Sequence, residues 1–379
     1  MFQKIGILGG GQLGRMLIQS AISLDIEVYV LDASIHAPCA AVTPNFVCGD
    51  ITNFEDVMTF GEQMDIITVE IENVNIEALI SLKSKGKNVY PDPDILALIK
   101  DKGTQKSYFA EHDFPSSKFR LFSNKSEIVH ALNIGQIQFP FVQKLRKEGY
   151  DGRGVCIIKD TLALKQAFDT PSIVEELVDI QSELAIMIAR NADGDTTIFP
   201  IVEMDFHSEA NMLNYVQCPA DIPNSLSEQI ENLAISLVKD VDFIGIMAIE
   251  LFLTHDGKIM INELAPRPHN SGHHTIEACN FSQFDMHLRS ILNLPLPKVM
   301  LKKHAIMMNL VGSEGYTGSA ICSGLHEVMT SPDAHVHWYG KKETKPMRKM
   351  GHITFTGTNH FETMHTYLRL KDQIQIVSQ

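Results

Sequence analysis

Charged and amide side chains crowd into one short segment, residues 261–274, directly after an apolar run. Glu263, Arg267, His269 and Asn270 lie within eight residues of one another, and two further histidines close the segment. The two prolines of this segment restrict its backbone dihedral angles and remove two N–H donors, so we expect a rigid, irregular backbone. Polar groups held in this way at the end of a strand are typical of a binding or catalytic site.

A second carboxylate upstream forms a pair with Glu263. The apolar run 243–253 predicts a buried strand with Glu250 as its one acid, and Gly257 predicts a turn into a strand over 258–262. Cross-strand neighbours lie about 5 Å apart, so the two carboxylates repel each other unless a cation lies between them. One interpretation is a solvated acid beside an acid in a salt bridge. The other is Mg²⁺, held by Glu250, Glu263 and nucleotide phosphates.

A glycine-rich segment is a candidate phosphate-binding loop. Residues 149–154 read Gly-Tyr-Asp-Gly-Arg-Gly and lie between predicted strands over 141–144 and 155–158. Three glycines in six residues allow main-chain N–H groups to approach anionic oxygens, and Arg153 adds a positive charge. Lys144 ends the first strand, and a lysine beside a glycine loop is typical of phosphoryl-transfer sites. The alternative is an ordinary hairpin turn.

The first hundred residues predict a different kind of unit. Strands over 4–8, 28–31 and 65–71, with a helix over 12–24, indicate a parallel sheet of Rossmann-like form. The turn from Gly9 to Gly14 matches G-x-G-x-x-G, and Asp32 ends the next strand, as in a dinucleotide site. Taken alone, this predicts an NAD(P)-dependent oxidoreductase. Hydride transfer needs neither a second phosphate site nor paired acids, so the downstream motifs weigh against it.

Composition and charge limit the classes of protein. The 379 residues carry a formal net charge of −14 with no basic run, which argues against a nucleic-acid-binding surface. No segment reaches the roughly 18 apolar residues of a membrane span, and the N-terminus lacks a signal-peptide pattern. Six dispersed cysteines without a C-x-x-C pair suit free thiols. We expect a cytoplasmic enzyme of two or three domains, without nucleic-acid or membrane partners.

The order of these motifs resembles that of the ATP-grasp ligase superfamily. A lysine on a strand, the GYDGRG loop, an acidic run over 174–177, Glu250 and then Asn262-Glu263 follow one another as they do there. Within the superfamily, GGGQLGRM (9–16), GYDGRG and NELAPRPHNSGH (262–273) are similar to motifs of the N5-carboxyaminoimidazole ribonucleotide synthase family of purine biosynthesis. The resemblance covers nearly the whole chain.

The resemblance implies an ATP-grasp fold, α/β in class and α+β overall. It divides the chain into a Rossmann-like N-terminal domain (1–100), linker helices with a small lid domain (101–178), and a C-terminal ATP-grasp domain (179–379) with a β-rich portion at 296–379. It also implies a homodimer that uses ATP and bicarbonate to carboxylate 5-aminoimidazole ribonucleotide through carboxyphosphate. A formate-using ATP-grasp ligase of purine biosynthesis is an alternative.

Elements outside the motifs follow from local pattern. The chain is expected to be helical between 91 and 113 and to have short C-terminal strands over 305–310, 334–339 and 353–355, followed by a helix over 360–370.

The resemblance assigns many candidates to an ATP site. Lys102 falls where the family usually has arginine, and it keeps the charge without bidentate phosphate binding; a helix-surface lysine is the alternative. Residues 174–178 are expected to be a linker along the adenine edge, with Glu175 at its exocyclic amine and Glu183 at the ribose. His207 requires one inserted residue, and a surface-loop histidine is its alternative. The predicted ATP-binding residues are Lys102, Lys144, Gly149, Tyr150, Asp151, Gly152, Arg153, Gly154, Val155, Glu175, Glu176, Leu177, Val178, Glu183, His207, Asn262 and Glu263.

The remaining candidates belong to the ribonucleotide and to catalysis. Because alternate strand residues point to opposite faces, the sequence leaves open which of Glu70 and Glu72 faces the substrate. In isolation, Lys341 and Arg348 also fit a solvated basic loop. The predicted substrate-binding residues are Gly11, Gln12, Leu13, Glu70, Glu72, and, at the 5'-phosphate, Lys341 and Arg348. The predicted catalytic residues are Tyr150, Asp151, Arg153, Arg267, His269 and Asn270, with Arg267 on bicarbonate or carboxyphosphate and Asp151 or His269 as the base.

A zinc site is the alternative for the histidines of the 261–274 segment. His269 and His273 are four residues apart, a spacing at which two imidazoles on a helix share a metal. Residues 270–272, however, fit a cap before a helix over 275–279. This places His273 and His274 in the first turn and His269 outside it, so we interpret the first two as structural.

Overall fold

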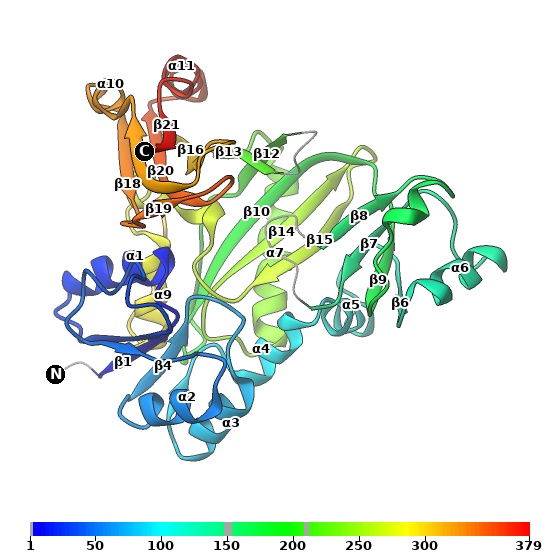
Figure 1. Ribbon diagram of the computed structural model, residues 1–379, viewed down its shortest axis with the longest axis horizontal. Helices are drawn as coiled ribbons and strands as arrows, with labels where there is room; N and C mark the ends of the chain where they lie inside the picture. Colours follow the sequence, from blue (N-terminus) through cyan, green and yellow to red (C-terminus); the bar gives the residue numbers. More distant parts are fainter. Residues whose placement is uncertain (1–2, 148–153, 208–211) are drawn as a thin grey trace.

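The computed structural model describes residues 3–147, 154–207 and 212–379 (Figure 1). Within these residues, the strands form a five-stranded, a nine-stranded, a four-stranded and a three-stranded sheet. In the part of the chain that the structure describes, no helix is both long and apolar enough to cross a membrane. The β14–β15 hairpin of the nine-stranded sheet occupies the centre of Figure 1.

The N-terminal sheet is parallel, with strand order β3-β2-β1-β4-β5, as its alternating pattern predicted. The two shortest strands, β3 and β5, were not predicted, because two or three residues are too few to show a periodicity. The apolar face of α1 packs against α9, which joins this sheet to the rest of the protein. Its elements are β1 (Ile5–Leu8), α1 (Gln12–Ile22), β2 (Val28–Asp32), β3 (Phe46–Cys48), α2 (Phe54–Gly61), β4 (Ile66–Val69), α3 (Ile76–Ser84) and β5 (Asn88–Val89).

The helical region predicted between 91 and 113 is two helices, α4 (Pro93–Lys100) and α5 (Lys102–Glu111). Asp101 separates them in extended conformation, and its carboxylate accepts the backbone N–H groups of Gly103 and Thr104 at the start of α5. Arg146 holds the same carboxylate through two hydrogen bonds of 2.9 Å. The break therefore fixes where α5 begins and brings Lys102 to its first position.

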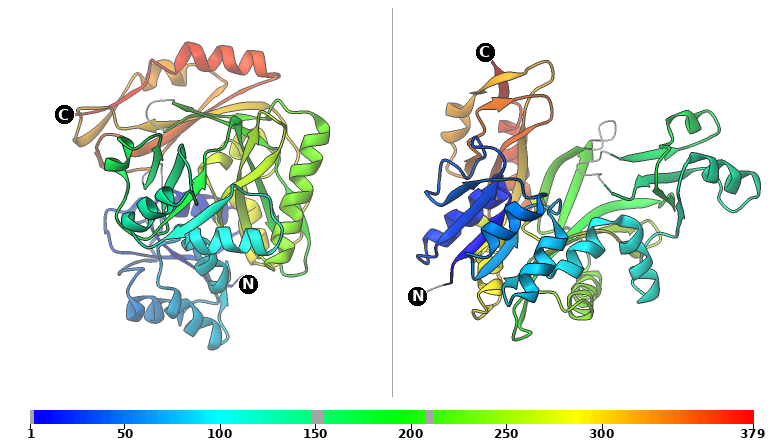
Figure 2. Two further views of the ribbon diagram at one scale, coloured as in Figure 1. Left: turned by 90° about the vertical axis from the view of Figure 1, so that its right-hand side faces the viewer. Right: turned by 60° about the horizontal axis from the view of Figure 1, so that its bottom comes forward.

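A four-stranded antiparallel sheet forms the lobe that projects to the right in Figure 1. Its order is β6-β9-β7-β8, and α6 packs an apolar face onto it. Figure 2 shows this lid sheet on the opposite side of the β14–β15 hairpin from the N-terminal sheet. Its elements are β6 (Phe119–Phe122), α6 (Lys125–Asn133), β7 (Phe141–Leu145), β8 (Val155–Ile158), a 3₁₀ helix (Ala163–Gln166) and β9 (Ser172–Glu176).

The prediction that residues 174–178 form a linker was wrong for their first half. Residues 174–176 lie in β9, which pairs with both β6 and β7. Three of the five residues of β9, 172–174, are Ser-Ile-Val, and the strand is buried up to Glu175. The linker was expected from the family resemblance, which did not take this strand into account.

The nine-stranded sheet runs through the centre of the molecule in the order β15-β14-β10-β12-β13-β16-β20-β18, with β11 beside β10. The helix α7 covers one face of its first strands with apolar side chains. The predicted hairpin is confirmed, and Glu250 pairs directly with Glu263 across it. The elements are β10 (Ile180–Arg190), β11 (Thr196–Ile198), β12 (Val202–His207), β13 (Met212–Cys218), α7 (Asn224–Asp240), β14 (Gly245–Thr254), β15 (Ile259–Ala265), β16 (His304–Val311), β18 (Ala334–Trp338) and β20 (Lys349–Gly357).

Two of the predicted C-terminal strands are longer than predicted, β16 with eight and β20 with nine residues, whereas β18 ends one residue earlier than predicted. The strand β20 pairs with β16 along most of its length and with β18 over residues 351–355. The helix predicted over 360–370 is confirmed. The other elements of this part are a 3₁₀ helix (Asn270–Gly272), α8 (Thr275–Ala278), α9 (Gln283–Ile291), β17 (Gly318–Ser323), α10 (Leu325–Met329), β19 (Glu343–Thr344), α11 (His360–Leu370) and β21 (Gln375–Ser378).

Candidate active site

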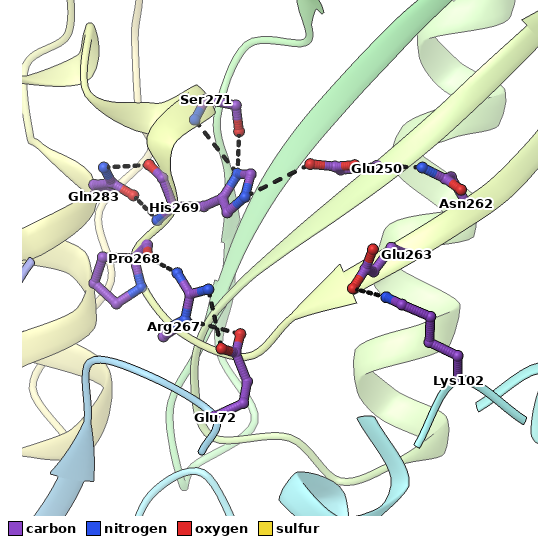
Figure 3. Close-up of polar contacts among 10 residues, drawn as sticks. All are labelled: Glu72, Lys102, Glu250, Asn262, Glu263, Arg267, Pro268, His269, Ser271 and Gln283. Atoms are coloured by element: carbon purple, nitrogen blue, oxygen red, sulfur yellow. Dashed lines mark hydrogen bonds and ion pairs between the residues drawn. The ribbon is translucent and has the colours of Figure 1, made fainter. Parts of the chain in front are cut away.

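The hairpin carries a β-bulge at its acidic pair. Glu250 pairs with Glu263 but the next residue of β14 pairs with Ile261, so Asn262 is left without a partner in the ladder. Such an extra residue re-aims a side chain that would otherwise point to the opposite face. The amide of Asn262 lies 3.4 Å from a Glu250 oxygen, and Glu263 binds the ammonium of Lys102 (Figure 3). The bulge therefore brings two successive side chains to one site.

Three carboxylates share this face of the sheet. Glu250 pairs with Ala185 of β10. Glu183 precedes Ala185 by two residues in the same strand and therefore lies on the same face. Burial, together with repulsion from Glu263 and Glu183, raises the pKa of Glu250 to about 7. Burial likewise raises the pKa of Glu183 to about 7. The site therefore has an excess of negative charge that a bound cation would relieve.

Lys144 connects the lid sheet to the hairpin. Its ammonium lies 3.0 Å from the Asn262 amide oxygen and 3.1 Å from a carboxylate oxygen of Glu175. The structure therefore brings together the predicted residues Lys102, Lys144, Asn262 and Glu263. Lys102 contacts the acidic pair, and its side chain is only 13% exposed, so the alternative of a helix-surface lysine does not describe it.

The carboxylate of Glu175, which the sequence placed at the exocyclic amine of adenine, is occupied by other side chains. Ser117 donates a hydrogen bond of 2.8 Å to it, and Lys106 lies 3.6 Å from its second oxygen. Burial alone would raise the pKa of this carboxyl, but the ammonium groups of Lys144 and Lys106 hold it below its usual value. Lys106 and Ser117 were not predicted. Lys106 follows Lys102 by one helical turn, and that spacing was the available signal.

A second cluster of polar side chains lies around the two prolines that follow β15. The guanidinium of Arg267 contacts both carboxylate oxygens of Glu72, at 2.8 and 3.1 Å. The backbone of His269 exchanges two hydrogen bonds with the Gln283 side chain, at 2.7 and 2.9 Å. The imidazole of His269 has Nδ1 2.9 Å from the Ser271 hydroxyl and Nε2 3.6 Å from Glu250. Figure 3 shows His269 between the acidic pair and this Arg267 cluster.

The glycine turn before α1 holds a carboxylate of its own. Glu70, in the bend after β4, accepts the backbone N–H groups of Gly11 and Gly14. A Cβ atom at Gly11 would lie 2.3 Å from a Glu70 oxygen, so only glycine permits this approach. Asp32 accepts the N–H groups of Gly10 and Ser34, each at 2.8 Å. The donors and the acid that a dinucleotide would use are engaged, which argues against the oxidoreductase alternative.

Both candidate acids after β4 therefore face site residues, Glu70 the glycine turn and Glu72 Arg267. Strand alternation was the reason for leaving open which of them faces the substrate. It does not apply here, because the predicted strand over 65–71 ends at Val69. Gln12 and Leu13 begin α1 directly beside this turn.

The basic loop lies next to α1. Lys341 donates a hydrogen bond of 2.7 Å to the Lys349 carbonyl, and Arg348 donates one of 2.8 Å to the Glu343 carbonyl. Gly340, with a φ of 78°, approaches the Arg15 side chain of α1 so closely that a Cβ would lie 2.9 Å from it. The structure thus brings the basic loop and the helix of the glycine turn together.

Several predicted residues lie outside the described parts of the chain. Gly149, Tyr150, Asp151, Gly152 and Arg153 fall in the gap 148–153. Of their neighbours, Gly154 has a φ of 78° and Val155 begins β8. The remaining predicted ATP residues lie at the ends of two strands. Glu176 and Leu177, at the end of β9, are exposed, and Val178 is half-buried. His207 ends β12.

The comparisons with known proteins agree with this geometry. Residues 2–100 match a ribonucleotide synthetase preATP-grasp domain, 107–284 an ATP-grasp domain, and 305–366 a phosphoribosylaminoimidazole carboxylase C-terminal domain. The N5-carboxyaminoimidazole ribonucleotide synthase of Synechococcus elongatus is 35% identical over 357 residues, which cover 93% of this chain and 89% of that protein. The chain belongs to the N5-carboxyaminoimidazole ribonucleotide synthase family.

Other relatives and solved structures extend the comparison. The phosphoribosylaminoimidazole carboxylase of Candida albicans is 37% identical over 93% of this chain, which spans 63% of that relative's length. The synthetase structure from Thermotoga maritima has a TM-score of 0.91, with 37% identity over 100% of both chains. A synthase from Aspergillus clavatus, in complex with ADP and 5-aminoimidazole ribonucleotide, has a TM-score of 0.88 and 31% identity over 98% of both chains. The predicted ATP-grasp fold is confirmed.

Within this family fold, the other two histidines of the segment are buried. His273 Nδ1 lies 3.0 Å from the Gln283 amide, and His274 Nδ1 lies 3.0 Å from the Ser271 carbonyl. Together with His269, the three imidazoles face three different sets of partners, which agrees with a structural role for His273 and His274. The predicted cap at 270–272 was wrong: those residues form a 3₁₀ helix, and the His269 imidazole accepts the Ser271 N–H.

Proposed function

We propose that the protein is an ATP-dependent carbon–nitrogen ligase, a 5-(carboxyamino)imidazole ribonucleotide synthase. It would use bicarbonate to carboxylate the amine of 5-aminoimidazole ribonucleotide, giving N5-carboxyaminoimidazole ribonucleotide, ADP and phosphate. The observation that carries the proposal is that His269 lies between two clusters that suit different ligands. On one side, the acidic pair and Lys144 suit a metal-bound nucleotide; on the other, Arg267 suits a small anion.

The residues of the hairpin fit Mg²⁺. In the described residues, no group of three or more His, Cys, Asp or Glu side chains is placed to hold a metal. Mg²⁺ with a nucleotide needs only one or two carboxylates, because phosphates and waters complete its shell. The observation that favours a cation here is that Glu250, Glu263 and Glu183 share one face of the sheet; burial, and then repulsion from the other two acids, raises the pKa of Glu250. Glu250 and Glu263 would hold the ion, which would offset the charge on the phosphates.

The protein's own groups have clear roles in the proposed reaction. Lys144 and Lys102 would orient the γ-phosphate while a bicarbonate oxygen attacks its phosphorus and the bond to ADP breaks. Arg267 would hold the resulting carboxyphosphate. The ribonucleotide amine then attacks the carboxyl carbon, and phosphate leaves. His269 would take the amine proton. Asp151, outside the described residues, is the alternative base.

The predicted homodimer and cytoplasmic location belong to the same proposal. Light scattering at several protein concentrations tests the first, and a mass of one chain at all of them would contradict it.

The experiment that tests the function measures ADP release from ATP. We expect release that requires both 5-aminoimidazole ribonucleotide and bicarbonate. Release that bicarbonate does not stimulate but formate does would replace this reaction with that of the formate-using alternative. Saturable binding of NAD(P) together with no ADP release would favour the oxidoreductase.

A further inference from the structure

Lys106, Glu175 and Lys144 form a buried ion triad behind the nucleotide side of the site. The two ammonium groups lie on different carboxylate oxygens, Lys106 3.6 Å from Oε1 and Lys144 3.1 Å from Oε2. The Ser117 hydroxyl connects Lys106 with Glu175, because it accepts a hydrogen bond from the Lys106 ammonium and donates one to the Glu175 carboxylate. The side chains of Lys106 and Glu175 are each 3% exposed, and that of Lys144 is 12% exposed.

The triad has a front, where Lys144 approaches the hairpin side chains, and a back, where Lys106 is buried. Lys144 lies at the front, where it contacts Asn262, which in turn contacts Glu250. Lys106 lies at the back, where, among the residues that the structure describes, its ammonium also contacts the Ser117 hydroxyl and the carbonyl of Ile261, at 2.9 and 3.4 Å. Its burial leaves no path to a nucleotide, so any effect of Lys106 on the reaction must pass through its neighbours.

The charges of the triad do not cancel. Two ammonium groups face one carboxylate, so the triad carries one net positive charge. Inside a protein, such charges interact several times more strongly than in water. Without Lys106, Glu175 and Lys144 would form a neutral pair, and the ammonium of Lys144 would be held against Glu175. With Lys106 present, the carboxylate is already neutralised from behind.

We propose that Lys106 is a positioning residue for Lys144: by neutralising Glu175, it directs the positive charge of Lys144 toward the phosphates of the bound nucleotide. The inference rests on the proposed function only in that it takes the nucleotide to bind in front of Lys144. A charged lysine is an expensive way to fill this space, since burial lowers the pKa of Lys106 to about 8 despite the attraction of Glu175. A buried ion group replaced as a whole by apolar side chains often keeps its stability, so the charge of Lys106 suits a role beyond packing.

The first test is Lys106→Met, which keeps much of the side-chain volume and removes the charge. We expect ADP, added with Mg²⁺ and followed by calorimetry, to bind about tenfold more weakly, as for one lost contact between charged groups. The KM for 5-aminoimidazole ribonucleotide should stay within about twofold of wild type, since Lys106 faces the nucleotide side only. Lys106→Arg keeps the charge and should lose less ADP affinity than Lys106→Met.

A matched control is Lys118, directly before β6, which pairs with the residue of β9 that follows Glu175. Lys118 pairs with Glu176 at 3.6 Å, as Lys106 pairs with Glu175, but both side chains are exposed. Lys118→Met therefore removes a similar ion pair without touching the triad, and ADP affinity should not change.

The decisive variant is the double change Lys106→Met with Glu175→Gln. It restores one net positive charge at Lys144, so we expect it to bind ADP more tightly than Lys106→Met alone. If Lys106 serves only packing, the second change should weaken binding further, and that outcome would overturn the proposal. Unchanged ADP affinity in a folded Lys106→Met would overturn it as well. If Lys106→Met does not fold, the comparison of Lys106→Arg with the double variant decides the matter.

The test does not depend on turnover. ADP binding reports on the triad even if ADP release proves not to need bicarbonate, in which case the proposed function fails and the triad inference stands. Conversely, normal bicarbonate-dependent turnover with unaltered ADP affinity in the variants overturns only the triad inference.

Discussion

Glu70 and Glu250 are both half-buried carboxylates with a raised pKa, yet their surroundings are opposite. Burial raises the pKa of Glu70 against two hydrogen bonds from backbone N–H groups, whereas the pKa of Glu250 is raised by burial and by two other carboxylates. A carboxylate surrounded by donors has its charge satisfied from within the protein and fixes a turn. A carboxylate repelled by neighbouring acids, as Glu250 is, has a charge that an added cation would stabilise. The comparison separates a structural acid from a ligand-binding one.

Removing the acid of the hairpin should have the largest effect. We expect Glu250→Gln to lower turnover by about a thousandfold, because Mg²⁺ loses one of its two carboxylates and the phosphate charge is less well offset. ADP release at increasing Mg²⁺ measures this, and the variant should fail to saturate. Asp256→Asn, at the exposed turn of the same hairpin, is the control and should behave as wild type. A wild-type response of Glu250→Gln to Mg²⁺ would remove the distinction between the two acids.

The matching change on the other side is Glu70→Gln. An amide has one oxygen acceptor, so its NH₂ group would face one of the two N–H donors of the glycine turn. We expect the KM for the ribonucleotide to rise about tenfold, as for one unsatisfied hydrogen bond. The dependence of the rate on Mg²⁺ should stay that of wild type. A changed Mg²⁺ dependence would show that Glu70 belongs to the metal side after all.

The basic loop sharpens which side takes the ribonucleotide. We expect Lys341→Ala to raise the KM for the ribonucleotide several-fold, since one exposed phosphate contact is lost, and to change the KM for ATP less. Steady-state kinetics with each substrate varied gives the two values. Lys342→Ala, one residue further and exposed, is the matched control. A larger change in the KM for ATP would assign this loop to the nucleotide.

The smallest expected effect concerns stability. The pKa of Glu183 is raised to about 7, so its contribution to stability is fully present below the unfolded-state pKa of 4.5 and is lost as the pH rises through 7. Glu183→Gln removes this loss. Urea unfolding without Mg²⁺ should show wild type losing about 1 kcal/mol more than the variant between pH 4.5 and 7.5, a value discounted for partial exposure. Parallel losses in the two proteins would show that Glu183 does not titrate in this range.

Local patterns predicted the elements that are defined by their own residues. The apolar run with one acid, the turn at Gly257 and the following alternation were enough to place Glu250 opposite Glu263. The alternation of strands and helices in the first hundred residues was enough for the parallel sheet. In both cases, periodicity and turn residues act over fewer than about twenty residues.

The site contacts that were missed join residues distant in sequence. Lys106 reaches Ile261, 155 residues away, and Glu175 meets Ser117 across 58 residues. The bulge that exposes Asn262 depends on the register of two strands, which a shift of one residue would reverse. Likewise, the predicted linker at 174–178 gave no sign that β6 and β7 would pair with it from both sides. These contacts follow from the three-dimensional arrangement of the elements.

The nine-stranded sheet also determines how a truncated form of the protein would behave. In the described residues, the strand β13 pairs with the C-terminal strands through three residue pairs, 216–218 with 305–307. A fragment that stops after α9 would keep the hairpin and the lid sheet, but it would leave the outer edge of β13 with unpaired N–H and C=O groups. Exposed strand edges recruit other chains. Such a fragment would therefore self-associate, and the C-terminal strands protect the central sheet from aggregation.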